Sequence, residues 1–94
     1  MNTLHIIRSS AFSSNDLQQA LSLASENDSI VLTDDGVYNL NHPLLNKHTP
    51  HTIYCVEQHL IARGINDNLA AATLISMAQL VELTLTHKPV ITWQ

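Results

Sequence analysis

The chain has 94 residues, of which 45% are hydrophobic, 13% are charged and 4% are aromatic. This composition is typical of a globular protein with an aliphatic core, and it excludes a disordered chain. The formal net charge is -4, and the four Lys and Arg residues are spread along the sequence. That distribution excludes a nucleic-acid interface built on clustered cations.

We expect one domain over residues 1–94, because a chain of this length supports a single core. So short a chain leaves apolar surface uncovered, which favours oligomers. Cys55 is the only cysteine, so it can form no internal disulfide. The sequence has neither the basic-then-apolar pattern of a signal peptide nor an apolar run of about 18 residues. We therefore expect a soluble, cytoplasmic protein.

The first third of the chain predicts two short buried strands on either side of a helix. Thr3–Ile7 is apolar and reads as a strand, and the small polar residues Ser9–Asn15 suit a loop and a side-chain N-cap. From Leu17 to Ala24, apolar residues recur at i, i+3, i+4 and i+7, the spacing of one helical face. Ser29–Thr33 is β-branched and apolar without alternation, as expected for a strand covered on both faces.

The middle of the chain predicts a turn, a weak helix and a loop before the next strand. Asp34–Gly36 predicts a turn in which glycine takes a positive φ and a carboxylate caps the following helix. Val37–Leu45 predicts the weak helix, ending near Pro43, and Lys47–His51 predicts the loop.

The remaining elements alternate in type. They are predicted as a strand at Thr52–Val56, a helical turn at Glu57–Ala62 stopped by Arg63-Gly64, a loop at Asn66–Asn68, a strand at Ala72–Ser76, a helix at Met77–Thr86 ended by Pro89, and a strand at Val90–Trp93. Strands that alternate with helices predict a mostly parallel sheet covered on both faces. The predicted fold class is α/β, a small three-layer Rossmann-like or flavodoxin-like domain.

In such a sheet, ligands bind at the carboxyl ends of the strands. Ser9-Ser10, Asp34–Gly36 and the stretch after Val56 should gather there. The first of these loops is not glycine-rich, which argues against a nucleotide site and leaves no cofactor indicated. Asp34 and Asp35 are adjacent, so their carboxylates should point in different directions and not act as a catalytic pair.

The histidines suggest no metal centre. His48 and His51 have a spacing that zinc sites use, but Pro50 lies between them and a structural site needs about four ligands. His5 lies on a buried strand, where a histidine is usually a hydrogen-bonded core residue. His42, His59 and His87 have no partner recognisable in the sequence.

Cys55 is the one candidate for covalent sulfur chemistry. A reactive thiolate needs partial exposure and a nearby cation or helix N-terminus. Cys55 lies within a predicted strand, where a thiol is usually a small buried hydrophobe. The structural interpretation is therefore preferred, and catalysis through Cys55 is the alternative.

Several segments together resemble the TusB/DsrH family of sulfur-relay subunits. In chain order they are Leu4–Ser9, Asp34–Val37, Leu60–Ile65, Leu83–His87 and Trp93. The resemblance covers essentially the whole chain, although no single segment is specific. It implies a DsrE-like fold and a heterohexamer with two copies each of three homologous subunits, the others being TusC-like and TusD-like. It also implies that the complex passes persulfide sulfur toward 2-thiolation of the wobble uridine of tRNA.

In this family the sulfur-carrying cysteine belongs to a sister subunit, where it precedes a helix that ends in Arg-Gly. Aligning that motif with Arg63-Gly64 places the sister's cysteine opposite Val56 and not Cys55, and a one-residue offset in a strand reverses the side chain's face. The sulfur-oxidising branch carries a cysteine in the first helical region, and residues 9–26 have none. This difference favours the tRNA branch.

We therefore interpret the chain as a non-catalytic, TusB-like subunit that docks through its last third, Leu69–Leu85, with no membrane contact and no direct contact with nucleic acid. One alternative is a carrier that takes a persulfide on Cys55. Another is a DsrH-like subunit in dissimilatory sulfur oxidation, and a third is a stand-alone binding module.

Overall fold

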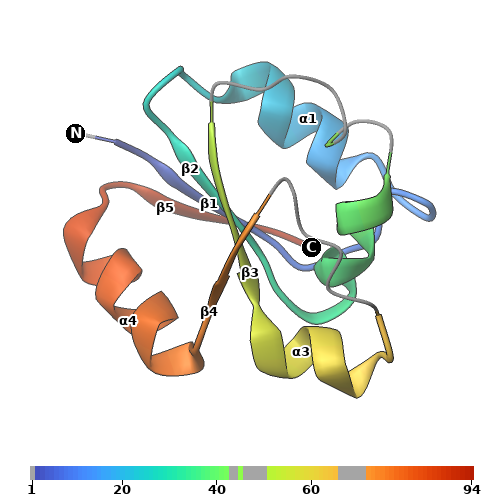
Figure 1. Ribbon diagram of the computed structural model, residues 1–94. Helices are drawn as coiled ribbons and strands as arrows, with labels where there is room; N and C mark the ends of the chain where they lie inside the picture. Colours follow the sequence, from blue (N-terminus) through green and yellow to red (C-terminus); the bar gives the residue numbers. More distant parts are fainter. Residues whose placement is uncertain (1, 43–44, 46–50, 66–71) are drawn as a thin grey trace.

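The computed structural model describes residues 2–42, 45, 51–65 and 72–94. Five parallel strands form one sheet in the order β4-β3-β2-β1-β5 (Figure 1). They are β1 (Leu4–Ile7), β2 (Ser29–Leu32), β3 (Thr52–Val56), β4 (Thr73–Ile75) and β5 (Val90–Trp93). The α/β class and the parallel sheet are confirmed, and each predicted strand is correct to within one residue at either end.

The two faces of the sheet are covered unequally. Helix α1 (Asp16–Leu23), the 3-10 helix η1 (Asp34–Asn41) and helix α3 (Glu57–Ala62) lie on one face, and helix α4 (Met77–Thr86) lies on the other (Figure 1). The larger core cluster joins Ile7, Ile30, Leu32, Ile53 and Cys55 to the three-helix layer. The smaller one joins Leu4, Val31, Val56 and Ile75 to Leu80 of α4.

The segment after β2 differs from its prediction. The expected helix at Val37–Leu45 begins three residues earlier, as the 3-10 helix η1, and its expected end runs into residues 43–44, outside the described part. The positive φ falls on Asp34, at 50°, and not on Gly36. Gly36 is required for space, because a Cβ there would lie 2.0 Å from the carbonyl oxygen of Ile7.

The helix caps also differ from expectation. Asn15, at the N-cap of α1, makes no side-chain capping bond, and no carboxylate caps η1. A full capping box lies instead at α4, where the Ser76 hydroxyl accepts from the Gln79 N–H and the Gln79 side chain accepts from the Ser76 N–H. The left-handed glycine predicted after α3 is confirmed at Gly64, with φ 64°.

A polar triplet, buried at His5 and Asp28 and partly buried at Trp93, ties the first strand to the last one and to the loop before β2. The indole N–H of Trp93 donates to Nδ1 of His5 at 3.2 Å, and Nε2 of His5 lies 3.1 Å from Asp28 Oδ2. Since an indole nitrogen can only donate, Nδ1 is the acceptor and Nε2 carries the proton that is given to Asp28. The prediction that His5 is a hydrogen-bonded core residue is confirmed.

Asp28 is a buried acceptor that stays ionised. Burial by itself raises the pKa of its carboxyl, but hydrogen bonds from the N–H groups of Ser25 and Thr3 and from His5 outweigh that effect and hold the pKa below its usual value. The carboxylate thereby organises the turn that leads into β2.

Replacing Gly36 with Ala should destabilise the protein far more than replacing Gly64 with Ala. The first change forces a methyl group against the backbone of Ile7 and should cost more than about 3 kcal/mol. The second meets no atom within 4 Å, so it should cost only about 1–2 kcal/mol for the left-handed conformation. Urea unfolding of both variants measures the difference, and equal losses would contradict the close contact.

Replacing Asp28 with Asn should cost on the order of 1–2 kcal/mol near neutral pH, because a charged acceptor of several hydrogen bonds is lost. A carboxyl with a lowered pKa adds stability above its unfolded-state pKa, and that contribution disappears as the pH falls through the folded-state pKa. The difference in the free energy of unfolding between wild type and variant should therefore become smaller below about pH 4. Unfolding measured from pH 7 to pH 3 tests this, with the exposed Glu26→Gln as the control, and a gap independent of pH would refute it.

Candidate functional site

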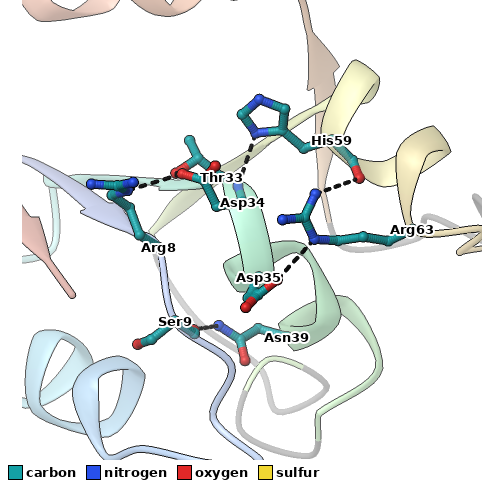
Figure 2. A network of polar contacts seen from close by, with 8 residues as sticks. All are labelled: Arg8, Ser9, Thr33, Asp34, Asp35, Asn39, His59 and Arg63. Carbon is teal, nitrogen blue, oxygen red and sulfur yellow. Dashed lines mark hydrogen bonds and ion pairs between the residues drawn. The ribbon is translucent and has the colours of Figure 1, made fainter.

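Polar side chains converge at the carboxyl ends of β1 and β2 and on the neighbouring α3 (Figure 2). We call this set the strand-end cluster; it comprises Arg8, Ser9, Thr33, Asp34, Asp35, Asn39, His59 and Arg63. The three segments predicted to gather at this end of the sheet do so. Three of the segments that carry the family resemblance, Leu4–Ser9, Asp34–Val37 and Leu60–Ile65, contribute side chains to the cluster.

Asp34 connects Arg8, which follows β1, to His59 of α3. Its Oδ2 accepts from Arg8 Nε at 2.9 Å, and its backbone N–H donates to Nδ1 of His59 at 2.8 Å. Desolvation raises the pKa of this carboxyl, but the hydrogen bond and charge of Arg8, aided by His59 and Thr33, lower it below the usual value. The left-handed backbone at Asp34 is one that aspartate tolerates better than most residues.

Asp35 points the other way, toward α3. Its Oδ1 accepts from Arg63 Nε at 3.0 Å, and Arg63 also donates to the backbone carbonyl of His59. The prediction that the adjacent carboxylates diverge is therefore confirmed. The Asp35 side chain is 65% exposed, and ion pairs this open contribute at most about 1 kcal/mol. The contacts of Arg63 with Asp35 and with His59 fix the orientation of α3 relative to η1.

Asn39 is a member of the cluster that the sequence analysis missed. Its side chain is fully buried, donates to the carbonyl of Ser9 and accepts from the N–H of Ala11 at 2.6 Å. It thus satisfies the backbone of the loop after β1. A lone Asn in a helical stretch gives no signal of this, because its partners are about 30 residues away in the sequence.

The chemistry available to the strand-end cluster is limited by its internal pairing. Each arginine is matched with one carboxylate, Arg8 with Asp34 and Arg63 with Asp35. Neither guanidinium therefore offers a whole unbalanced charge to an anion such as phosphate. Among the residues that the structure describes, no three His, Cys, Asp or Glu side chains are arranged to hold a metal ion. The geometry supports a role in positioning loops.

Cys55 lies outside this cluster. Its side chain is fully buried in β3 beneath the three-helix layer, among aliphatic residues of the larger core. Burial raises the pKa of its thiol to about 11, so the nucleophilic thiolate is scarce at neutral pH. The neighbouring Val56 points to the opposite face, beneath α4, and is equally buried. The offset predicted between positions 55 and 56 is thus present in the structure.

The histidines have partners that the sequence analysis did not foresee. His59 belongs to the strand-end cluster, and the ring of His42 packs edge-on against Phe12. His87 lies within hydrogen-bond distance of the Leu83 carbonyl and the Ser29 hydroxyl, which joins the end of α4 to the start of β2. The sequence did not reveal these contacts, because His59, His42 and His87 each meet a residue that lies far away in the chain. His48 lies outside the described residues.

Comparison with known proteins adds a family. Residues 9–90 match the family model described as DsrH like protein. "Protein TusB" of Yersinia pestis (strain Pestoides F) is 39% identical over 88 residues, which cover 83% of this chain and 87% of that protein. "Protein TusB" of Buchnera aphidicola subsp. Baizongia pistaciae is 34% identical over 94 residues, covering 96% and 99% respectively.

A solved structure supports the fold. The solution NMR structure of Protein Tm0979 from Thermotoga maritima matches with a TM-score of 0.70 at 21% sequence identity, covering 93% of this chain and 95% of that chain. At 21% sequence identity, this structural similarity establishes the fold and nothing about the function. In the described part of this chain, no helix has the length and apolar character needed to cross a membrane.

Cys55 should resist alkylation in the folded protein. With its thiol buried and its pKa raised to about 11, iodoacetamide should modify it at neutral pH at least about a hundredfold more slowly than in the urea-unfolded chain, where the pKa returns to about 8.5. Mass spectrometry of the intact protein over time measures both rates. Rapid modification of the native protein near pH 7 would show that the thiol is accessible and acidic.

Proposed function

This chain belongs to the DsrH/TusB family, and from that premise we propose that it is a non-catalytic subunit of a cytoplasmic sulfur-relay complex. The observation that carries the proposal is the burial of Cys55, the only cysteine of the chain. A persulfide carrier must present its sulfur to a donor and then to an acceptor. A thiol with no exposed surface and a raised pKa is suited to neither step.

The position that corresponds to the sulfur-carrying cysteine of a sister subunit is occupied by an apolar residue in this chain. In the alignment on Arg63-Gly64, the sister's cysteine corresponds to Val56. Val56 is fully buried and belongs to the smaller core beneath α4. This position contributes packing energy and offers no nucleophile, which supports a structural role for the chain.

Docking is the proposed contribution of this subunit, and α4 provides the surface. Met77, Val81 and Leu85 are 41%, 56% and 76% exposed. They recur every four residues and form one stripe, which begins beside Leu80, where α4 packs on the sheet, and turns away from the sheet toward Leu85. An exposed apolar stripe of this kind marks a contact with another protein. It falls within the Leu69–Leu85 interface expected from the sequence, whose residues 69–71 lie outside the described part.

The proposed partners are the homologous TusC-like and TusD-like subunits, assembled as a heterohexamer with two copies of each chain. The proposed product of the pathway is 2-thiolated wobble uridine in tRNA. Direct tRNA contact is assigned to other components, because this chain carries only four Lys and Arg and has a formal charge of -4. In the strand-end cluster, two of those four cations are already paired with carboxylates.

A charge placed within the stripe should break the complex. We expect Val81→Lys to reduce co-purification with co-expressed TusC-like and TusD-like chains at least about tenfold, because burying an unpaired ammonium at an interface costs several kcal/mol. The readout is the stoichiometry of the affinity-purified complex.

The matched control is Thr86→Lys, which adds the same charge at an exposed position of α4 off the stripe. It should leave the complex intact. If the wild-type chain fails to co-purify with either partner, or if both variants behave alike, the docking role is wrong.

A further inference from the structure

The imidazole of His59 serves as a hydrogen-bond acceptor for the backbone. The N–H of Asp34 donates to Nδ1 of His59 at 2.8 Å (Figure 2). In a neutral imidazole one nitrogen accepts and the other carries the proton, so His59 holds its proton on Nε2. A protonated imidazole carries a hydrogen on both nitrogens and can accept at neither. The contact between Asp34 and His59 therefore exists only while His59 is neutral.

This hydrogen bond lies where the chain turns from the sheet into η1. Thr33 is still extended, and its N–H donates to the carbonyl of Ile7 at 3.0 Å. Asp34, the next residue, has a φ of 50° and is thus in the left-handed region. The change of direction between these two residues turns the N–H of Asp34 toward α3, where His59 accepts it.

A second contact joins the same two elements and does not depend on the charge of the histidine. Arg63 donates to Asp35 Oδ1 at 3.0 Å and to the backbone carbonyl of His59. A guanidinium keeps its charge over the whole range in which a histidine titrates. Loss of the bond to His59 thus releases the first residue of η1, while Arg63 still holds α3 beside Asp35.

The charged and titratable groups near His59 come from its own helix and from the elements packed against it. Among the described residues they are Glu57 and Arg63 of α3, Asp34 and Asp35 of η1, Cys55 of β3, and Arg8, which is paired with Asp34. Desolvation raises the pKa of the Asp34 carboxyl, but the hydrogen bond and charge of Arg8 lower it below the usual value. Asp34 is therefore ionised where histidines titrate, and a protonated His59 competes with Arg8 for this carboxylate.

We propose that His59 is a pH-sensitive switch, which connects α3 to the start of η1 when its imidazole is neutral and releases it when the imidazole is protonated. A proton taken up at Nδ1 replaces the acceptor with a second donor, so the ring can no longer bind the Asp34 N–H. The imidazolium also adds one positive charge to a cluster in which two arginines and two aspartates balance each other. The contact is lost as the pH falls through the range in which histidines gain a proton, between about pH 8 and pH 5.

The test is amide hydrogen exchange at Asp34, followed by NMR of the whole chain at about pH 7.5 and about pH 5.5. The quantity compared is the protection factor, the ratio of the intrinsic to the measured exchange rate. For Asp34 it should be at least about tenfold lower at the acidic pH, because the hydrogen bond to His59 is lost. The neighbouring Thr33 amide is the internal control. It donates to the carbonyl of Ile7, which does not titrate, so its protection factor should be the same at both pH values.

Two substitutions separate the titration of His59 from other effects of pH. The side-chain oxygen of asparagine can take the place of Nδ1 and does not titrate, so His59→Asn should keep the Asp34 amide protected at both pH values. His59→Phe has no acceptor and should lower the protection at both.

The wild-type comparison decides by itself, without either variant. An Asp34 amide that is equally protected at both pH values would overturn the proposal. So would a loss of protection that Thr33 shares, because it would show that the sheet unfolds as a whole. A loss on acidification that persists in His59→Asn, or full protection in His59→Phe, would also overturn it. Since only this chain is used, these results are independent of docking to sister subunits.

Discussion

The unequal covering of one small sheet determines the rest of this structure. Among the described residues, α1, η1 and α3 cover one face and α4 covers the other. On the crowded face, Cys55 is fully enclosed and its thiol is held in the protonated form. On the other face, α4 buries Leu80 against the sheet and leaves a stripe of aliphatic side chains in solvent. The same architecture thus encloses the only cysteine of the chain and leaves apolar surface exposed, and these are the two features on which the proposed docking role rests.

The ends of the strands are fixed by polar contacts that connect distant parts of the sequence. Asp34 links β1 to α3 through Arg8 and His59, and Asn39 satisfies the loop after β1. The triplet of His5, Asp28 and Trp93 joins the first strand to the last one and to the loop before β2. A single exposed ion pair contributes little to stability. Together, however, these contacts set the angles at which the helices lie on the sheet.

Much of this arrangement can be predicted from local sequence. Short apolar runs rich in β-branched residues identify all five strands, because such residues favour the extended backbone of a sheet. The burial of Cys55 within Thr52–Val56 follows from the apolar run around it, and the divergence of Asp34 and Asp35 follows from their adjacency in the chain. These features depend on residues that are close together in the sequence, where the pattern of apolar and polar residues is a reliable guide.

The features that could not be predicted depend on contacts far away in the chain. Gly36 is needed because the backbone of Ile7 passes close to it, not because of its own φ. His59, His87 and Asn39 acquire partners from other elements, at sequence separations of 25 residues or more for Asp34, Ser29 and Ser9. Likewise, only the order of the strands in the sheet reveals that β5 returns beside β1.

We propose that this chain supports sulfur transfer without carrying sulfur. The most direct test of this proposal is the rate of persulfide transfer through the complex reconstituted with the Cys55→Ala chain, compared with the wild-type chain and with the chain omitted. In complexes of equal subunit composition, the variant should transfer sulfur at the wild-type rate, whereas omission should abolish transfer. A variant that assembles normally but transfers no faster than the mixture lacking this subunit would contradict the account.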